Sequence, residues 1–140
     1  MAGGISIEGV PGFEAGIDAL IATVQAATLR GVTAGAHLIE AQAKQSMNGP
    51  GPQVRTGTLR RSINVISTTT LGSGSYQARI APTVIYGRRM ELGYHGTDSL
   101  GRNYSNPGQR AYPYLSTGLN RSLPLLQGVF SAAWQAAMRA

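Results

Sequence analysis

An α+β fold is expected for this chain of 140 residues. Two long segments, one near each end, repeat their apolar residues at three- and four-residue steps, which is typical of a helix packed on one face. Between them, two β-branched runs flank a Gly/Ser turn, which is typical of an antiparallel hairpin. The length corresponds to about one domain. We therefore treat 1–140 as a single domain whose Gly-rich residues 1–10 form a flexible arm.

The first helix is expected from Pro11 to about Met47, because proline is tolerated at a helix start and the Pro/Gly-rich segment 48–52 stops the periodic pattern. About 35 residues at 1.5 Å each span roughly 50 Å, which exceeds the body of a globule of this size. Gly31 and Gly35 lie one turn apart in its middle. They indicate close packing by a neighbour or a kink, in preference to a break.

The hairpin follows the first helix. Thr58 is expected to cap a single helical turn that runs through Arg61. Strands are expected at 63–70 and 76–81, because both runs are rich in residues that favour an extended backbone. Residues 71–75, which are Leu-Gly-Ser-Gly-Ser, form the turn between them.

A second helical part closes the chain. Residues 83–92 are expected to form a short helix, and 93–110 a polar, Gly-rich loop. Loops of that length inside a compact domain are usually functional or disordered. The C-terminal helix places apolar residues on one face between 119 and 137, and Pro124, which falls early in it, marks its expected start.

Composition excludes several classes of function. The absence of cysteine excludes disulfide frameworks, thiolate metal sites and cysteine nucleophiles. No stretch approaches the ~18–20 apolar residues of a membrane span. Charged residues make up only 13% of the chain, against about 25% in an average protein, which favours a protomer covered by its neighbours. The net charge is +6 and every basic residue except Lys44 is arginine, which suits interfaces and phosphates, although a GC-rich coding bias also produces this excess.

Catalytic, cofactor-binding and metal-binding residues are not expected. The only lysine lacks the glycine-rich approach of a phosphate loop, and His37 and His95 are too far apart in the sequence for a metal-ligand motif. Glu14 and Asp18 are interpreted as complements of the dipole in the first turns of the helix. Glu91 stands in a region with few other acids and is interpreted as an ion pair or a cap that holds the long loop.

Two arginine clusters are the strongest candidates for contacts. The first contains Arg55, Arg60 and Arg61. The second lies among five of the six tyrosines and contains Arg88, Arg89, Arg102 and Arg110. Interleaved arginine and tyrosine stack on bases and pair with phosphates, and they are also favoured anchors of protein interfaces. The low total charge favours the second use, so we expect these residues and Glu91 to make inter-subunit or DNA-channel contacts.

Three short motifs follow one another along the chain. A Thr-Gly-x-Leu-x-x-Ser-Ile motif is formed by Thr56, Gly57, Leu59, Ser62 and Ile63. A motif of tyrosine followed by Glu-aromatic-Gly-Thr is matched by Tyr86, Glu91 and Gly93, with Leu92 at the aromatic position and Thr97 following only after a short insertion. A motif before the last helix is formed by Pro113, Tyr114 and Leu115. In this order and with these flanking helices, the chain resembles the neck and tail-component proteins of long-tailed double-stranded DNA bacteriophages.

The resemblance implies a ring-forming protomer, commonly sixfold, at the head–tail junction of a virion assembled in the host cytoplasm. Genomic double-stranded DNA would pass through the lumen, and the partners would be adjacent connector or stopper proteins and tail terminator or tail tube proteins. It implies no enzyme activity, no cofactor and no membrane. In such a ring, the small-residue stripe of the long helix, and a long loop that orders on assembly, would supply head-to-tail contacts.

The expected function is therefore that of a neck protein that joins the portal-side connector to the tail. A tail terminator or tail completion protein, which caps the tail tube, is the alternative within the same class. A non-enzymatic DNA-binding protein that uses the arginine and tyrosine residues is the alternative from another class.

Overall fold

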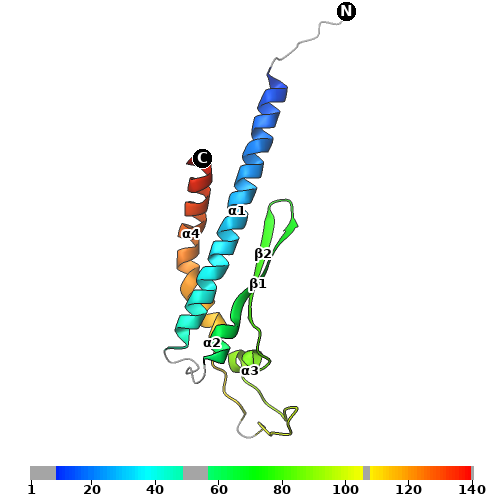
Figure 1. Cartoon of the computed structure of the whole chain (residues 1–140), viewed down its shortest axis with the longest axis vertical. Coiled ribbons are helices and arrows are strands. Elements are labelled where there is room, and N and C mark those ends of the chain that lie inside the picture. The colour runs from blue at the N-terminus through cyan, green and yellow to red at the C-terminus, as the bar shows by residue number, and fades with distance from the viewer. Residues whose placement is uncertain (1–8, 49–56, 106–107, 140) are drawn as a thin grey trace, which may run out of the picture.

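The computed structural model describes residues 9–48, 57–105 and 108–139. Its elements, in chain order, are α1 (Val10–Ser46), α2 (Thr58–Ser62), β1 (Ile63–Gly72), β2 (Ser75–Pro82), α3 (Gly87–Leu92) and α4 (Leu115–Arg139). Helix α1 forms the axis of the molecule, with α4 on one side and the hairpin on the other, while α2 and α3 gather at one end (Figure 1). The expected α+β class is confirmed, with a two-stranded antiparallel sheet.

Helix α1 is unbroken over 37 residues, which corresponds to about 55 Å. It begins after Gly9, which occupies the N-cap position with a φ of 90°. Pro11 stands in its first turn, as predicted. The first turn contains no acidic residue. The prediction that Glu14 and Asp18 complement the dipole there is therefore wrong, since the effect fades within one turn and both residues lie beyond it.

Helix α4 packs antiparallel along α1 in one continuous register. The facing pairs are Thr28 with Trp134, Gly31 with Phe130, Gly35 with Leu126 and Ala43 with Gly118. In every pair the two residue numbers add to 161 or 162, so the contact holds its register throughout. The glycines of α1 thus admit close packing, as one of the two interpretations predicted. Because α4 of the same chain covers this stripe, the stripe is not available for the subunit contact that we expected of it.

The hairpin lies where the strands were predicted and is slightly longer. Its register runs from Ile63 opposite Pro82 to Gly72 opposite Ser75, and Gly74 turns the chain with a φ of 77°. The short helix before it differs from the prediction. Helix α2 begins at Thr58 itself and its N-cap position is held by Gly57, so Thr58 is not the capping residue.

The helices that flank the loop also differ from the prediction. Helix α3 covers only Gly87–Leu92, while residues 83–86 form bends and turns. Helix α4 begins at Leu115, so the prediction that Pro124 marks its start is wrong. Pro124 is exposed inside the helix, where it removes one amide from the hydrogen-bond ladder.

The buried core is small and lies at the end where α2 and α3 meet α1 and α4. We call it the hub: the fully buried Ala43, Met47, Ile63 and Tyr114, against which Leu59, Ile80, Met90 and Leu115 pack. None of the helices in the described part of the chain has the combined length and apolarity that a membrane crossing requires.

Candidate functional site

The first and third sequence motifs converge on the hub, and the second reaches it through Glu91. Leu59 and Ile63 enter it from α2 and β1, and Tyr114 and Leu115 enter it from the start of α4. Ser62, also buried, donates its hydroxyl to the Leu59 carbonyl at 2.7 Å. Positions that are far apart in the sequence therefore meet around one tyrosine, and their residue types are explained by packing. Thr56 lies outside the described residues.

Tyr114 joins α3 to α4. Its side chain is fully buried, and its hydroxyl donates to the Gly87 carbonyl at 2.9 Å. Gly87 is closely packed, because a Cβ there would collide with the ring of Pro82. Burial, together with the nearby Glu91 and Tyr86, raises the pKa of Tyr114. The phenol therefore stays neutral and serves as a hydrogen-bond donor.

Glu91 caps the start of α4 from outside that helix. One carboxylate oxygen accepts the amides of Tyr114 at 2.7 Å and Leu115 at 2.8 Å. The other accepts the amide of Ser116 at 2.9 Å and also its hydroxyl. Burial raises the pKa of Glu91, but these hydrogen bonds, led by those from Ser116, outweigh it and leave the pKa below its usual value. Of the two interpretations, a cap is present, but it holds the start of α4, which follows the loop, and not the loop itself.

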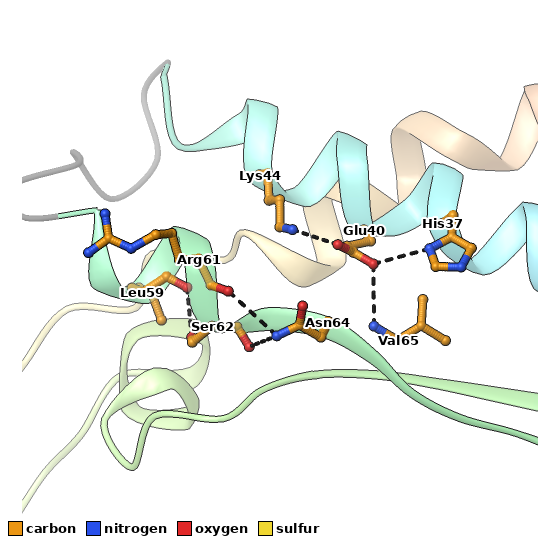
Figure 2. Close-up of polar contacts among 8 residues, drawn as sticks. All are labelled: His37, Glu40, Lys44, Leu59, Arg61, Ser62, Asn64 and Val65. Atoms are coloured by element: carbon orange, nitrogen blue, oxygen red, sulfur yellow. Dashed lines mark hydrogen bonds and ion pairs between the residues drawn. The ribbon is translucent and has the colours of Figure 1, made fainter.

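A second carboxylate, Glu40, ties the hairpin to α1 (Figure 2). It accepts the Lys44 ammonium at 2.5 Å on one oxygen, and on the other it faces His37 and the Val65 amide, each at 3.3 Å. Burial raises the pKa of Glu40, but the contacts, led by Lys44, lower it overall. Sequence reasoning did not single out Glu40, although its place four residues before Lys44 is a recognised helix pairing.

The long loop is folded in the single chain over its described residues. Its base is closed by a pair of backbone hydrogen bonds between Tyr94 and Gln109, at 3.0 and 2.7 Å. Farther out, Thr97 and Asn103 form a second bridge. Whether the loop orders only on assembly had been left open, and in the single chain these bonds already shape its described residues.

Asp98 organises the tip of the loop. Its carboxylate, 1% exposed, accepts the amides of Leu100 and Arg102 and the Arg102 guanidinium at 2.6 Å, and Arg89 approaches at 3.9 Å. Burial raises the pKa of Asp98, but the hydrogen bonds, led by those from Arg102, lower it overall. Leu100 is left 76% exposed on this ordered tip.

The candidate arginines separate into two groups. Those held inside the chain include Arg89, which lies 4.1 Å above the ring of Tyr94, and Arg102, which pairs with Asp98. Arg110 approaches the ring of Tyr112 at 5.8 Å, and Arg60 reaches the Asn48 side chain at 3.4 Å. Among the described residues, the side chains of Arg61 and Arg88 have no hydrogen-bonding or charged partner. Arg55 lies outside the described residues.

Charge is distributed unevenly along the molecule. The arginines of α2, α3 and the loop gather at one end, which we call the basic end (Figure 1). The two carboxylates of that end, Glu91 and Asp98, are already engaged with helix α4 and the loop. The opposite end, formed by the start of α1, carries Glu14 and Asp18, and α1 has no basic residue before Arg30. The molecule therefore has an acidic end and a basic end.

The described residues offer no group of three His, Asp or Glu side chains that would bind a metal ion. Comparisons of the chain with protein-family models, with curated proteins and with solved structures find no match. The resemblance to phage neck proteins therefore rests on the three motifs and on the arrangement of the elements around them.

Proposed function

We propose that this chain is a structural protomer of the head–tail junction of a long-tailed double-stranded DNA phage. In this role, copies join into a ring that connects the portal side to the tail and lets DNA pass through its lumen. The three motifs support the family assignment, because the first and third contribute residues to the hub and the second supplies Glu91, which binds the amides of Tyr114 and Leu115 there.

The observation that carries the assembly is the set of large apolar side chains left exposed on the two long helices. Each of the following is at least 41% exposed: Phe13, Ile17, Leu20, Ile21 and Val24 on α1, and Leu119, Leu123, Leu125, Trp134 and Met138 on α4. A surface of this kind is typical of a subunit that neighbours cover.

The unpaired guanidinium groups of the basic end support a contact with DNA or with a neighbouring ring. Arg61 and Arg88 project without internal partners among the described residues, and arginine pairs well with both phosphate and carboxylate. The same observation favours the second candidate, a free DNA-binding protein. That function requires tight binding of duplex DNA by the isolated chain, with a salt dependence of about 0.9 log units per phosphate contacted.

Electron microscopy of lysates from a phage that lacks this gene tests the proposal. Filled heads beside separate tails of normal length are the expected result. Overlong or ragged tails would assign the chain to the tail terminator instead. Intact virions, together with salt-sensitive binding of duplex DNA by the purified chain, would replace the proposal with the DNA-binding function.

Complementation with variants tests the basic end. A gene that carries Arg60→Glu and Arg61→Glu should yield a folded chain that does not restore joining. The matched control is Arg139→Glu, which reverses an exposed charge at the far end of α4. Normal infectious particles from the double variant would show that these two residues make no essential contact.

A further inference from the structure

The start of α1 extends beyond the rest of the protein. Helix α4 ends at Arg139, and the register that pairs Gly31 with Phe130 places that end opposite residue 22 of α1. Residues 10–21 therefore have no helix beside them, over about 18 Å. Figure 1 shows α1 rising past both the C-terminal end of α4 and the tip of the hairpin. We call residues 10–21 the overhang.

The overhang continues the face of α1 that α4 covers. Its exposed apolar side chains, together with Val24 just below it, are Phe13, Ile17, Leu20, Ile21 and Val24. Leu20 and Ile21 are adjacent, and the other steps along this series are of three or four residues; it leads directly to the covered Thr28, Gly31 and Gly35. Phe13 is 71% exposed. A helical face with this pattern is suited to packing against another surface.

An apolar groove lies at the other end of the molecule, beside the hub. It consists of two adjoining hollows of about 250 and 320 Å³ that share Leu115. The first is lined by Ile39, Ile80, Leu115, Ser116 and Leu119. The second is lined by Ala81, Pro82, Val84, Arg88, Glu91, Leu92 and Leu115. We call these residues the groove. Arg88 is its unpaired charge, because Glu91 is occupied by the start of α4.

Charge decides which surface suits the overhang. Glu14 comes directly after Phe13 in the sequence, and Asp18 directly after Ile17. Both carboxylates therefore lie along the same side of the apolar stripe. Pairing of two overhangs would bring these four carboxylates together, which is unfavourable. The groove offers apolar walls and Arg88 instead. Complementary charge at the edge of an apolar contact favours association and fixes its orientation.

We propose that the overhang of one copy packs into the groove of the next copy, with Glu14 and Asp18 facing Arg88. This inference rests on the proposed assembly and names the surfaces that make it. The contact is between copies, because Ile39 in the groove lies 22 residues along a straight helix from Ile17, or about 33 Å. Two different patches meet, so each copy gives one and receives one. Such a head-to-tail contact closes into a ring or extends as a filament.

The cysteine-free sequence allows a direct test by disulfide trapping. A chain with Ile17→Cys, uniformly labelled with heavy nitrogen, is mixed with an unlabelled chain with Leu92→Cys before assembly, under mild oxidation. The label gives mixed dimers a mass between those of the two self-dimers. Thiols bridge only when their Cα atoms come within about 7 Å. The matched control is Leu71→Cys, at the hairpin tip, which is 64% exposed where Leu92 is 65% exposed.

The expected result is a mixed dimer of the Ile17→Cys and Leu92→Cys chains, on the order of tenfold more abundant than with Leu71→Cys, since docking raises the local thiol concentration. A dimer of the Ile17→Cys chain with itself, or equal yields with both partners, overturns the contact. If mass photometry shows that the chains giving such results still assemble, the proposed function stands and only the proposed contact is overturned. A wild-type chain that stays monomeric at high concentration overturns the contact, and the phage lysates then decide the function.

Charge reversal provides the second measurement. Arg88→Glu should raise the dissociation constant of assembly on the order of tenfold, and Glu14→Arg should do the same. The two changes together should recover most of the loss, because they restore an opposite-charge pair. The matched control is Arg121→Glu, an exposed arginine that lines a separate hollow beside Ser46 and Tyr112. Additive losses in the double variant would overturn the pairing.

Discussion

Gly118 is a position where a single added methyl group should lower the free energy of unfolding, because the backbone of α1 lies against it. A Cβ at Gly118 would stand 2.5 Å from the backbone nitrogen and 2.7 Å from the Cα of Ala43. Backbone atoms of a long helix do not move aside as a flexible side chain does. The two helices must therefore separate locally, and the buried contact at the hub must loosen with them.

The magnitude follows from two opposing effects of Gly118→Ala. Overpacking of a closely packed site costs up to about 3 kcal/mol, while replacing glycine by alanine inside a helix returns about 1 kcal/mol. The net loss in the free energy of unfolding is about 2 kcal/mol. For a domain of this size, it corresponds to a fall in Tm of about 6 °C.

Gly128→Ala in the same helix is the matched control. Nothing lies within 4 Å of a Cβ at Gly128, so only the helix-propensity gain of up to about 1 kcal/mol remains. Urea denaturation of both variants, at concentrations where the chain is monomeric, measures the two changes. Opposite signs are expected. A Gly118→Ala chain as stable as Gly128→Ala would refute the close approach of α1 and α4.

Three further changes test the polar contacts. Glu91→Gln should lower the free energy of unfolding by about 1–2 kcal/mol at pH 7. The pKa of Glu91 lies below its usual 4.5. The difference in stability between the two chains should therefore be full above pH 4.5 and shrink as the pH falls through the lowered pKa. A deficit that does not vary with pH in urea titrations would argue against the charged cap. Tyr114→Phe should cost about 1–2 kcal/mol, because the Gly87 carbonyl loses its buried donor, and an unchanged Tm would contradict this. Asp98→Asn should speed hydrogen exchange of the Leu100 amide while leaving the Tm nearly unchanged; unaltered protection would mean that other bonds hold the loop tip.

The regular elements could be predicted because their signals are local. The apolar periodicity of α1 and the β-branched runs around residues 71–75 are written into neighbouring residues, and the structure confirms both. The start of α4 could not be found in the same way. Its cap is Glu91, which is 24 residues before Leu115, so no residue adjacent to the helix reveals where it begins. Pro124 was the strongest local signal, and tertiary contacts override it.

The candidate arginines show the same division between local and distant information. Arg102 follows Asp98 by four residues and pairs with it, although it had been predicted only as a contact residue, because that spacing indicates a pair on a helix and not in a loop. The approach of Arg89 to Asp98 and to the Tyr94 ring depends on the loop folding back over α3. That Arg61 and Arg88 have no partner among the described residues could not be predicted either, because it depends on which side chains lie near them in the folded chain.

The closed base of the long loop fixes the positions of the loop's two ends. The Tyr94–Gln109 bridge and the hydrogen bond from the Tyr112 amide to the Met90 carbonyl, at 2.7 Å, hold the two ends of the loop beside the hub. Among the described residues outward of that bridge, Asp98 adds a contact with α3, since Arg89 approaches it at 3.9 Å. Lengthening a loop whose ends are already fixed costs little, about 0.6 kcal/mol for each doubling. We therefore expect that the loop between Tyr94 and Gln109 can change in length and at its tip without refolding the helices beneath.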